Sequence, residues 1–202
     1  GRASEKIEGM ALLRAENQQY IHYRKGYIVM MALRDRIGEQ NMNKALKALI
    51  AEYKFSDTVQ ATTLDLVAAL KSVALQQDHA FIDTQFNQIS IYDLKIVDTV
   101  VNKQKDDEYS LTLTVSATQF EADGKGEETE QPFDEFVDII LFSEDPNDFS
   151  IESKLVYRQK HRLTSGQNTI TIATKSSFAY VGIDPFVRFI DRDSGDNVRK
   201  LW

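Results

Sequence analysis

The chain has 202 residues with a formal net charge of −7, 42% hydrophobic and 27% charged residues, and no cysteine. This composition is ordinary for one large folded domain or two small ones, and the acidic balance disfavours a nucleic-acid partner. The lack of cysteine excludes disulfides, thiolate nucleophiles and cysteine-based zinc sites.

The ends and the apolar runs of the sequence bear on its origin. No apolar run approaches the roughly 20 residues that span a bilayer. The N-terminal residues Gly1–Gly9 contain neither a signal peptide nor an initiator methionine. We therefore expect a soluble piece cut from a longer protein.

Helical periodicity dominates the first part of the chain. Residues 20–37 join three tyrosines to an apolar run, which Gly38 ends in the manner of a helix C-cap. Gly26 lies inside this helix. A glycine in a helix interior lowers helix stability by roughly 1 kcal/mol relative to alanine. We therefore expect another group to approach the backbone closely at Gly26. A second helix follows Gly38 with one apolar face, formed by Met42, Ala45, Leu46, Leu49, Ile50 and Tyr53.

Two further helices are predicted before residue 89. Thr62 stands three residues before Asp65, which is a variant of the capping box that begins helices. The helix that follows carries Leu64, Val67, Leu70 and Val73 on one face. A short helix over residues 78–88 completes a predicted all-helical module.

The periodicity changes to that of strands near Ile89. Residues 109–118 alternate strictly between apolar or aromatic and hydroxyl-bearing side chains, which predicts a half-buried strand. Residues 133–142 are apolar on both faces from Phe136 onward, which indicates a central strand. Further strands are predicted over residues 151–163 and 168–173, and turns at Asp123–Gly126, Asp145–Asp148 and Ser165-Gly166.

These patterns predict an α+β fold with two modules. Residues 1–88 form an N-terminal all-helical module. Residues 89–202 form an antiparallel, Ig-like β-sandwich, because short strands recur at the spacing typical of that fold.

Metal-binding and nucleophile motifs are weak in this sequence. The three histidines, His22, His79 and His161, are far apart and form no H-E-x-x-H helix, so we interpret them as surface or packing residues. The run Asp191–Asn197 resembles a calcium loop at first sight, but it lacks the glycine and glutamate positions of an EF-hand and is interpreted as a turn. The sequence contains neither a G-x-S-x-G nucleophile elbow nor a glycine-rich phosphate loop.

Tyr20 and Tyr23 remain as candidates for chemistry. A tyrosine hydroxyl on a rigid helix can donate a hydrogen bond to a developing oxyanion, and removing such a donor costs roughly 3 kcal/mol in the transition state. The ordinary alternative is an aromatic cluster at the helix start, with the hydroxyls reaching solvent. The residues alone leave both interpretations open.

A family resemblance adds to this picture. Tyr23-Arg24-Lys25-Gly26 with the following Ile28–Gly38 resembles the Tyr-x-Lys-Gly helix of the aminopeptidase N family of zinc peptidases, the gluzincins. Further segments across the chain resemble one subfamily, in which an ABC-type membrane permease precedes a peptidase-like part. They are Thr62–Leu66, Phe86–Asp93, Gly182–Phe186, Ile190–Arg192 and Asp196-Asn197.

The resemblance implies a role for Tyr23 and a parent protein. Tyr23 matches the tyrosine that stabilises the tetrahedral intermediate, whereas Tyr20 has no firm counterpart. Lys25 and Gly26 match the motif but need not take part in the chemistry, and Gly26 is expected to permit close packing. The parent is expected to bind zinc and a peptide substrate, but this chain lacks the zinc motif, so alone it is expected to be inactive and to hold no cofactor.

The implied partner is the N-terminal remainder of the same polypeptide, which carries the zinc-binding and membrane parts. The chain is then membrane-associated only through that parent, on a side of the membrane that the sequence leaves open. A second interpretation makes it a non-catalytic binding or assembly module of an ABC-type transporter. A third makes it an unrelated helical and β adaptor, in which Tyr23 points away from any cleft.

Overall fold

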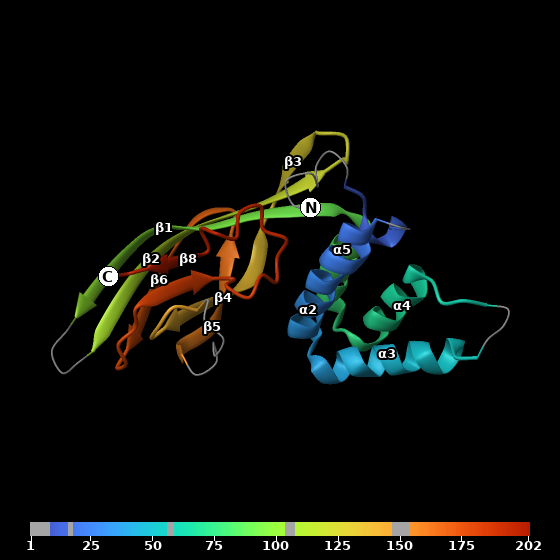
Figure 1. Cartoon of the computed structure of the whole chain (residues 1–202), viewed down its shortest axis with the longest axis horizontal. Coiled ribbons are helices and arrows are strands. Elements are labelled where there is room, and N and C mark those ends of the chain that lie inside the picture. The colour runs from blue at the N-terminus through green and yellow to red at the C-terminus, as the bar shows by residue number, and fades with distance from the viewer. Residues whose placement is uncertain (1–8, 16–17, 56–58, 104–107, 147–153) are drawn as a thin grey trace. The chain divides into compact units, whose positions relative to one another are not determined.

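A computed structural model describes residues 9–15, 18–55, 59–103, 108–146 and 154–202 (Figure 1). The chain divides into two compact units. The first comprises Gly1–Ser90, Glu121–Thr129 and Arg188–Ile190, and the second comprises Ile91–Phe120, Glu130–Val187 and Asp191–Trp202. The predicted boundary between residues 88 and 89 stays a prediction.

The described helices all lie in the first unit. They are the 3₁₀ turn η2 (Leu12–Arg14), the π-helical turn η3 (Tyr20–Lys25), α2 (Gly26–Ile37), α3 (Glu39–Tyr53), α4 (Thr63–Val73), the 3₁₀ turn η4 (Gln76–Asp78) and α5 (His79–Asn87). No helix in the described part of the chain is both long and apolar enough to cross a lipid bilayer. The helices predicted after Gly38, at Thr62 and near residue 78 are confirmed as α3, α4 and α5.

Local sequence signals set the ends of these helices. Gly38 has φ +85° and separates α2 from α3, which is the backbone conformation that favours glycine. The capping box of α4 is confirmed, because Thr62 Oγ1 accepts the Asp65 N–H at 3.4 Å and Asp65 Oδ2 accepts the Thr62 N–H at 2.8 Å. These bonds satisfy amide groups that have no partner within the helix.

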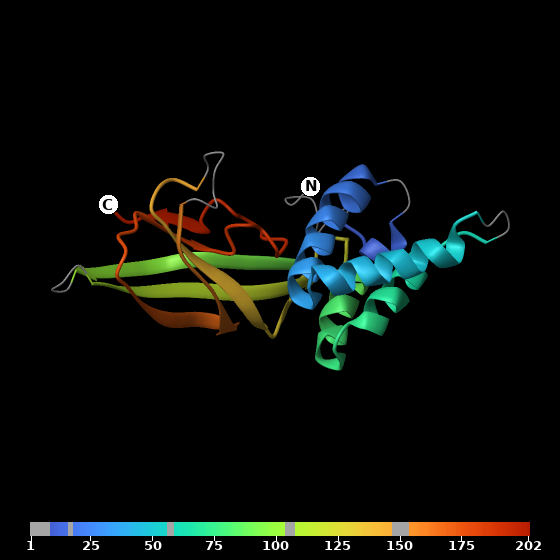
Figure 2. The same cartoon turned by 90° about the horizontal axis from the view of Figure 1, so that it is seen from below.

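The core of the helical unit is apolar and closely packed. Helices α3 and α4 lie side by side in both views (Figures 1 and 2). The most deeply buried apolar side chains of the unit are Ile21, Val29, Leu33, Ala45, Leu70, Ile82 and Phe86. Not every residue of the predicted apolar faces is covered, since the side chains of Ile50 and Leu64 are 63% and 64% exposed. Periodicity gives the direction of a side chain, but not how far the neighbouring helix extends to cover it.

The strands form two sheets. They are β1 (Ile89–Lys103), β2 (Tyr109–Ala122), β3 (Glu128–Gln131), β4 (Asp134–Phe142), β5 (Leu155–Thr164), β6 (Gly166–Thr174), β7 (Tyr180–Ile183) and β8 (Val198–Lys200). One sheet has the order β1-β2-β3 with β6 also paired to β2, and the other has the order β5-β4-β7-β8. The chain is therefore an α+β protein with antiparallel sheets, as the sequence predicts.

The patterns along β2 and β4 are borne out. The alternating residues Leu111, Leu113, Val115 and Ala117 of β2 are fully buried. Strand β4 is central, because it pairs with β5 on one side and β7 on the other. Its apolar run is buried from Val137 to Phe142, whereas Phe136 is 55% exposed.

The predicted turn at Ser165 joins two strands that belong to different sheets. Strand β5 pairs with β4, whereas β6 pairs with β2 in the other sheet, from Tyr109↔Thr174 to Ala117↔Gly166. Ser165 and Gly166 therefore form a corner at which the chain passes from one sheet to the other. Part of the turn predicted at Asp145–Asp148, namely Asn147 and Asp148, lies outside the described residues. The start of the predicted strand, residues 151–153, also lies outside them.

Candidate functional site

Tyr23 lies in the π-helical turn η3, which leads directly into α2. At the end of this turn the Gly26 N–H bonds to the carbonyls of both Ile21 and Tyr23. π-helical turns are rare and occur often at functional positions. The turn is held from one side, because Ile21 is fully buried and Lys25, four residues on, is 5% exposed.

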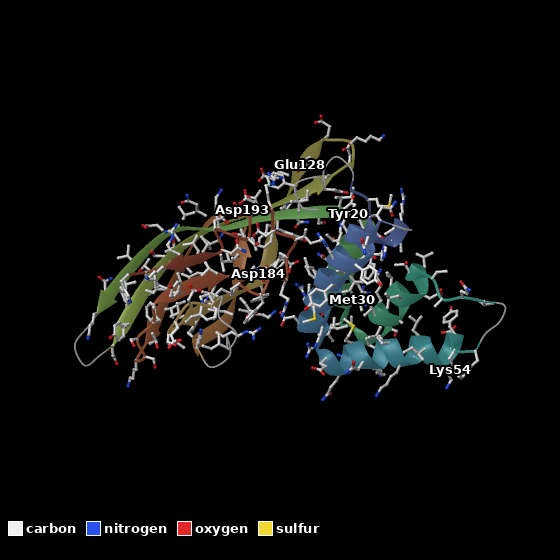
Figure 3. The ribbon with its side chains drawn as sticks, viewed as in Figure 1. Tyr20, Met30, Lys54, Glu128, Asp184 and Asp193 are labelled. Atoms are coloured by element: carbon white, nitrogen blue, oxygen red, sulfur yellow. The ribbon has the colours of Figure 1, made fainter. Side chains whose placement is uncertain are left out.

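The opposite side of the turn displays aromatic rings to solvent. Tyr23 is 68% exposed, and its ring centroid lies 4.9 Å from that of His22 with the planes tilted by 50°. Tyr27, one turn along the helix, is 64% exposed. Figure 3 marks the half-buried Tyr20 at the start of the turn and Met30 farther along the helix. The hydroxyl of Tyr23 is thus free of the hydrophobic interior and accessible to a ligand.

The prediction that another group approaches the backbone closely at Gly26 is wrong. A Cβ atom built on Gly26 would lie 3.7 Å from the Ile21 carbonyl oxygen and 3.8 Å from a Leu12 methyl carbon, which are ordinary contacts. Gly26 also has α-helical backbone angles, φ −55° and ψ −42°. A glycine is therefore not required there by packing or by backbone conformation.

The histidines have separate local contacts. His22 is exposed beside Tyr23, and His79 Nε2 lies 3.0 Å from the Lys71 carbonyl oxygen. His161 Nε2 lies 2.7 Å from the Tyr157 hydroxyl. Within the described ranges, no group of three histidine, aspartate or glutamate residues could hold a metal ion.

The run Asp191–Asn197 is confirmed as a turn, but it contains a feature that its sequence did not reveal. Two successive Asx turns form it: the Asp193 N–H donates to Asp191 Oδ1 at 2.9 Å, and the Gly195 N–H donates to Asp193 Oδ1 at 3.0 Å. Asp191 itself is 0% exposed, and burial raises its pKa to about 6. Nothing in the spacing of acidic and small residues distinguishes this buried carboxyl from its exposed neighbours.

A shallow depression lies at the ends of β2 and β6. It has a volume of about 260 Å³ and is lined by Glu108, Tyr109, Ala173, Thr174 and Lys175. The Lys103 ammonium lies 5.5 Å from the centroid of the Tyr109 ring, in cation–π range. None of the residues predicted to act in chemistry lines this depression.

No protein-family model matches the chain, and no curated protein matches it.

Proposed function

We propose that this chain is the C-terminal part of a zinc aminopeptidase-like protein fused to an ABC-type permease. Its described helices belong to the peptidase-like part, and its strands form an Ig-like β-sandwich that braces it. The observation that carries the proposal is the display of Tyr23, 68% exposed on a π-helical turn whose other side is anchored by buried residues. The resemblance of the Tyr-x-Lys-Gly segment supplies the reaction class.

In the proposed role, Tyr23 acts by donating a hydrogen bond. Its phenolic O–H would donate to the oxyanion of the tetrahedral intermediate formed during peptide cleavage. Anchoring by Ile21 and Lys25 supports this role, because a donor that is fixed in advance needs no reorganisation when charge develops. The ring of His22 lies beside the phenol, with the two ring centroids 4.9 Å apart.

The described residues do not fit a zinc site by themselves, since they contain no group that could hold the ion. On this proposal the zinc ligands lie in the preceding part of the polypeptide, which is also the main partner of this chain. Membrane association likewise comes through that part, and a peptide is the substrate. The chain alone is expected to be inactive.

The sheet connectivity supports the proposed sandwich. The corner at Ser165 joins two antiparallel sheets, and both contribute fully buried side chains, such as Leu113 in β2 and Ile139 in β4. Crossing between sheets in this way is typical of sandwich folds.

The test is a matched pair of substitutions in the intact protein. Tyr23→Phe removes one hydroxyl from the exposed π-helical turn, and Tyr27→Phe removes one from a similarly exposed position on α2, which continues that turn. Turnover of an aminoacyl reporter in the presence of zinc should fall roughly 100- to 1000-fold for Tyr23→Phe, with little change in KM. Tyr27→Phe should retain normal turnover. Equal turnover for both variants and the unmodified protein would remove Tyr23 from the mechanism.

A second candidate is a non-catalytic binding or assembly module of the transporter. Exposed large hydrophobic side chains on the described helical unit favour it, since apolar surface left open to solvent is what an interaction partner would cover. They include Tyr27, Ile50, Leu64 and Leu75. On this alternative, Ile50→Ser with Leu64→Ser weakens co-purification of the chain with its separately expressed upstream part, whereas Tyr23→Phe has no effect on any activity of the intact protein.

A further inference from the structure

A hydrophobic side chain at the start of the connection between α3 and α4 is almost fully open to solvent. Phe55 follows the last turn of α3 and is 94% exposed, which is the largest exposed fraction of any large hydrophobic side chain in the described part of the chain. Its backbone has φ +60°, a conformation that a bulky residue rarely adopts. A single exposed hydrophobic residue is ordinary, so the significance of Phe55 depends on the residues near it.

The two helices are linked to each other next to Phe55. The Tyr53 hydroxyl in the last turn of α3 forms a hydrogen bond with the carboxylate of Asp65 in the first turn of α4. The same carboxylate accepts the Thr62 N–H at 2.8 Å, and α3 and α4 lie side by side (Figures 1 and 2). Phe55 therefore lies two residues beyond a fixed point, outside the packed part of the helices.

The face of α3 that leads to Phe55 is basic. At 3.6 residues per turn, Lys44, Lys47 and Ile50 project within an arc of about 120°. Lys54, which Figure 3 marks, follows the last turn directly. All four side chains are exposed. The end of α3 thus presents three cations next to two exposed hydrophobic side chains, Ile50 and Phe55.

The three lysines of this face are available to a partner. Within the described ranges, none of them has a hydrogen bond or an ion pair. Glu52 falls outside the arc of the lysines, and Glu39 at the start of α3 pairs with Arg34. Residues 40–55 contain three lysines and one glutamate, a net charge of +2, whereas the whole chain has a net charge of −7. The charge of this region is therefore opposite in sign to that of the chain.

We propose that a basic tip of the helical unit docks on an anionic lipid surface. The basic tip consists of Lys44, Lys47, Ile50, Lys54 and Phe55. The Phe55 ring enters the headgroup layer, and the lysine ammonium groups bind the anionic headgroups. Long lysine side chains permit this arrangement, because their aliphatic part can lie along apolar surface while the charged end stays in water. Exposed hydrophobic side chains combined with free lysines are typical of segments that bind the membrane interface.

The exposure of Phe55 favours lipid over a protein as the partner. A protein would have to provide an apolar pocket that fits the projecting ring, with acidic side chains around that pocket. A fluid lipid surface takes up a projecting apolar side chain without such a fit, and its anionic headgroups attract each lysine. The contact is independent of the proposed peptidase role, because it uses neither Tyr23 nor zinc.

The test is sedimentation of the unmodified 202-residue chain with lipid vesicles. One preparation contains phosphatidylcholine alone, and the other contains about one-third phosphatidylserine. We expect binding to the anionic vesicles and little binding to the neutral ones. The bound fraction should fall when NaCl is raised from about 0.1 M to about 0.5 M, because salt screens the lysines. This comparison needs no variant, so it does not depend on how a substitution affects folding.

Replacing the lysines tests the contribution of charge. Lys44→Gln, Lys47→Gln and Lys54→Gln together should lower the partition coefficient roughly 100-fold, since each lysine near an anionic surface contributes about fivefold. The matched control removes three exposed lysines elsewhere in the chain and should change binding by no more than about twofold. Its substitutions are Lys125→Gln, Lys175→Gln and Lys200→Gln.

Replacing the ring tests its insertion into the lipid. Phe55→Ser should lower the partition coefficient about tenfold, because the ring no longer leaves water. Leu75→Ser is the matched control, since Leu75 is 67% exposed and follows the opposite end of α4. It should leave binding unchanged.

The proposal is overturned by a lack of binding to the anionic vesicles, as expected if the basic tip docks on an acidic protein, or by equal binding to the neutral ones. Equal losses in the two lysine triples, or unchanged binding of Phe55→Ser, would also overturn it.

Discussion

Arg36 Nε donates a hydrogen bond to Asp78 Oδ1 at 2.8 Å, which joins α2 to the turn before α5. The same guanidinium lies 4.8 Å from the centroid of the Phe81 ring. Asp78 is 5% exposed, so loss of its partner would leave a buried charge uncompensated. We expect Arg36→Ala to lower the free energy of unfolding by roughly 3 kcal/mol, measured by urea denaturation.

The pair Arg162–Asp134 provides the control for this prediction. Its two hydrogen bonds are shorter, at 2.6 Å each, but both side chains are at least half exposed. Solvent screens such a pair, so Arg162→Ala should leave the urea midpoint nearly unchanged. Equal losses for the two variants would show that burial is not the deciding factor.

The glycines at the two ends of α2 should respond in opposite directions to alanine. Gly26 has helical angles and room for a Cβ, so Gly26→Ala should stabilise the protein by up to about 1 kcal/mol. A Cβ on Gly38 would also have room, with no atom within 4 Å, but Gly38 has φ +85°. Gly38→Ala should therefore destabilise the protein by about 1 kcal/mol. Thermal denaturation of both variants measures the difference. A loss of stability in Gly26→Ala would mean that its neighbourhood is tighter than described.

Gly182 in β7 has a close approach of the kind that was expected at Gly26. A Cβ there would lie 3.0 Å from Pro185 Cβ and 3.1 Å from Pro185 Cγ. Because real Cβ atoms rarely come this close, Gly182→Ala should force a shift and cost roughly 1–3 kcal/mol. Pro185→Ala combined with Gly182→Ala keeps a Cβ at position 185 but removes Cγ, and should restore part of the loss.

His161 should make the free energy of unfolding depend on pH. Burial lowers the pKa of His161 below its ordinary value of about 6.5. The unfolded chain then binds the proton more readily, so stability contributed by the neutral ring is present at high pH and is lost as pH falls through 6.5. We expect His161→Gln to reduce the loss of stability between pH 7.5 and pH 5.5, measured by urea denaturation at each pH.

The hydrogen bonds of His161 explain why glutamine is the appropriate replacement. The Tyr157 hydroxyl lies 2.8 Å from Gln159 Oε1 and 2.7 Å from His161 Nε2. A hydroxyl that donates to Gln159 can still accept from an N–H, which a glutamine amide also provides. An unchanged pH dependence in His161→Gln would assign the effect to another group.

The sequence is informative about single elements. The alternation along β2, the capping box of Thr62 and the C-cap at Gly38 each depend on residues within one element, and the structure contains all three. Strand β1 was not predicted as a strand. Its first half is buried on both faces while its second half is exposed, so it has no single period.

Features that depend on distant residues were not predictable from periodicity. The burial of Asp191 depends on β1, where the Leu94 N–H donates to its carboxylate. The sheet change at Ser165 depends on the partners of β5 and β6, which local sequence does not specify. Tyr23 could be selected as a candidate because the resemblance covers its motif. Its exposed position agrees with that role, which stays a prediction.

The corner at Ser165 has a consequence for how the second unit assembles. Strand β6 pairs with β2, so Tyr109 lies opposite Thr174, which follows it by 65 residues (174 − 109) in the sequence. Strand β5, just before the corner, belongs to the other sheet. Neither sheet can be completed from a contiguous stretch of chain. Late, non-local pairing of this kind slows folding, so a nascent chain that has not yet produced β6 still exposes the edge of β2.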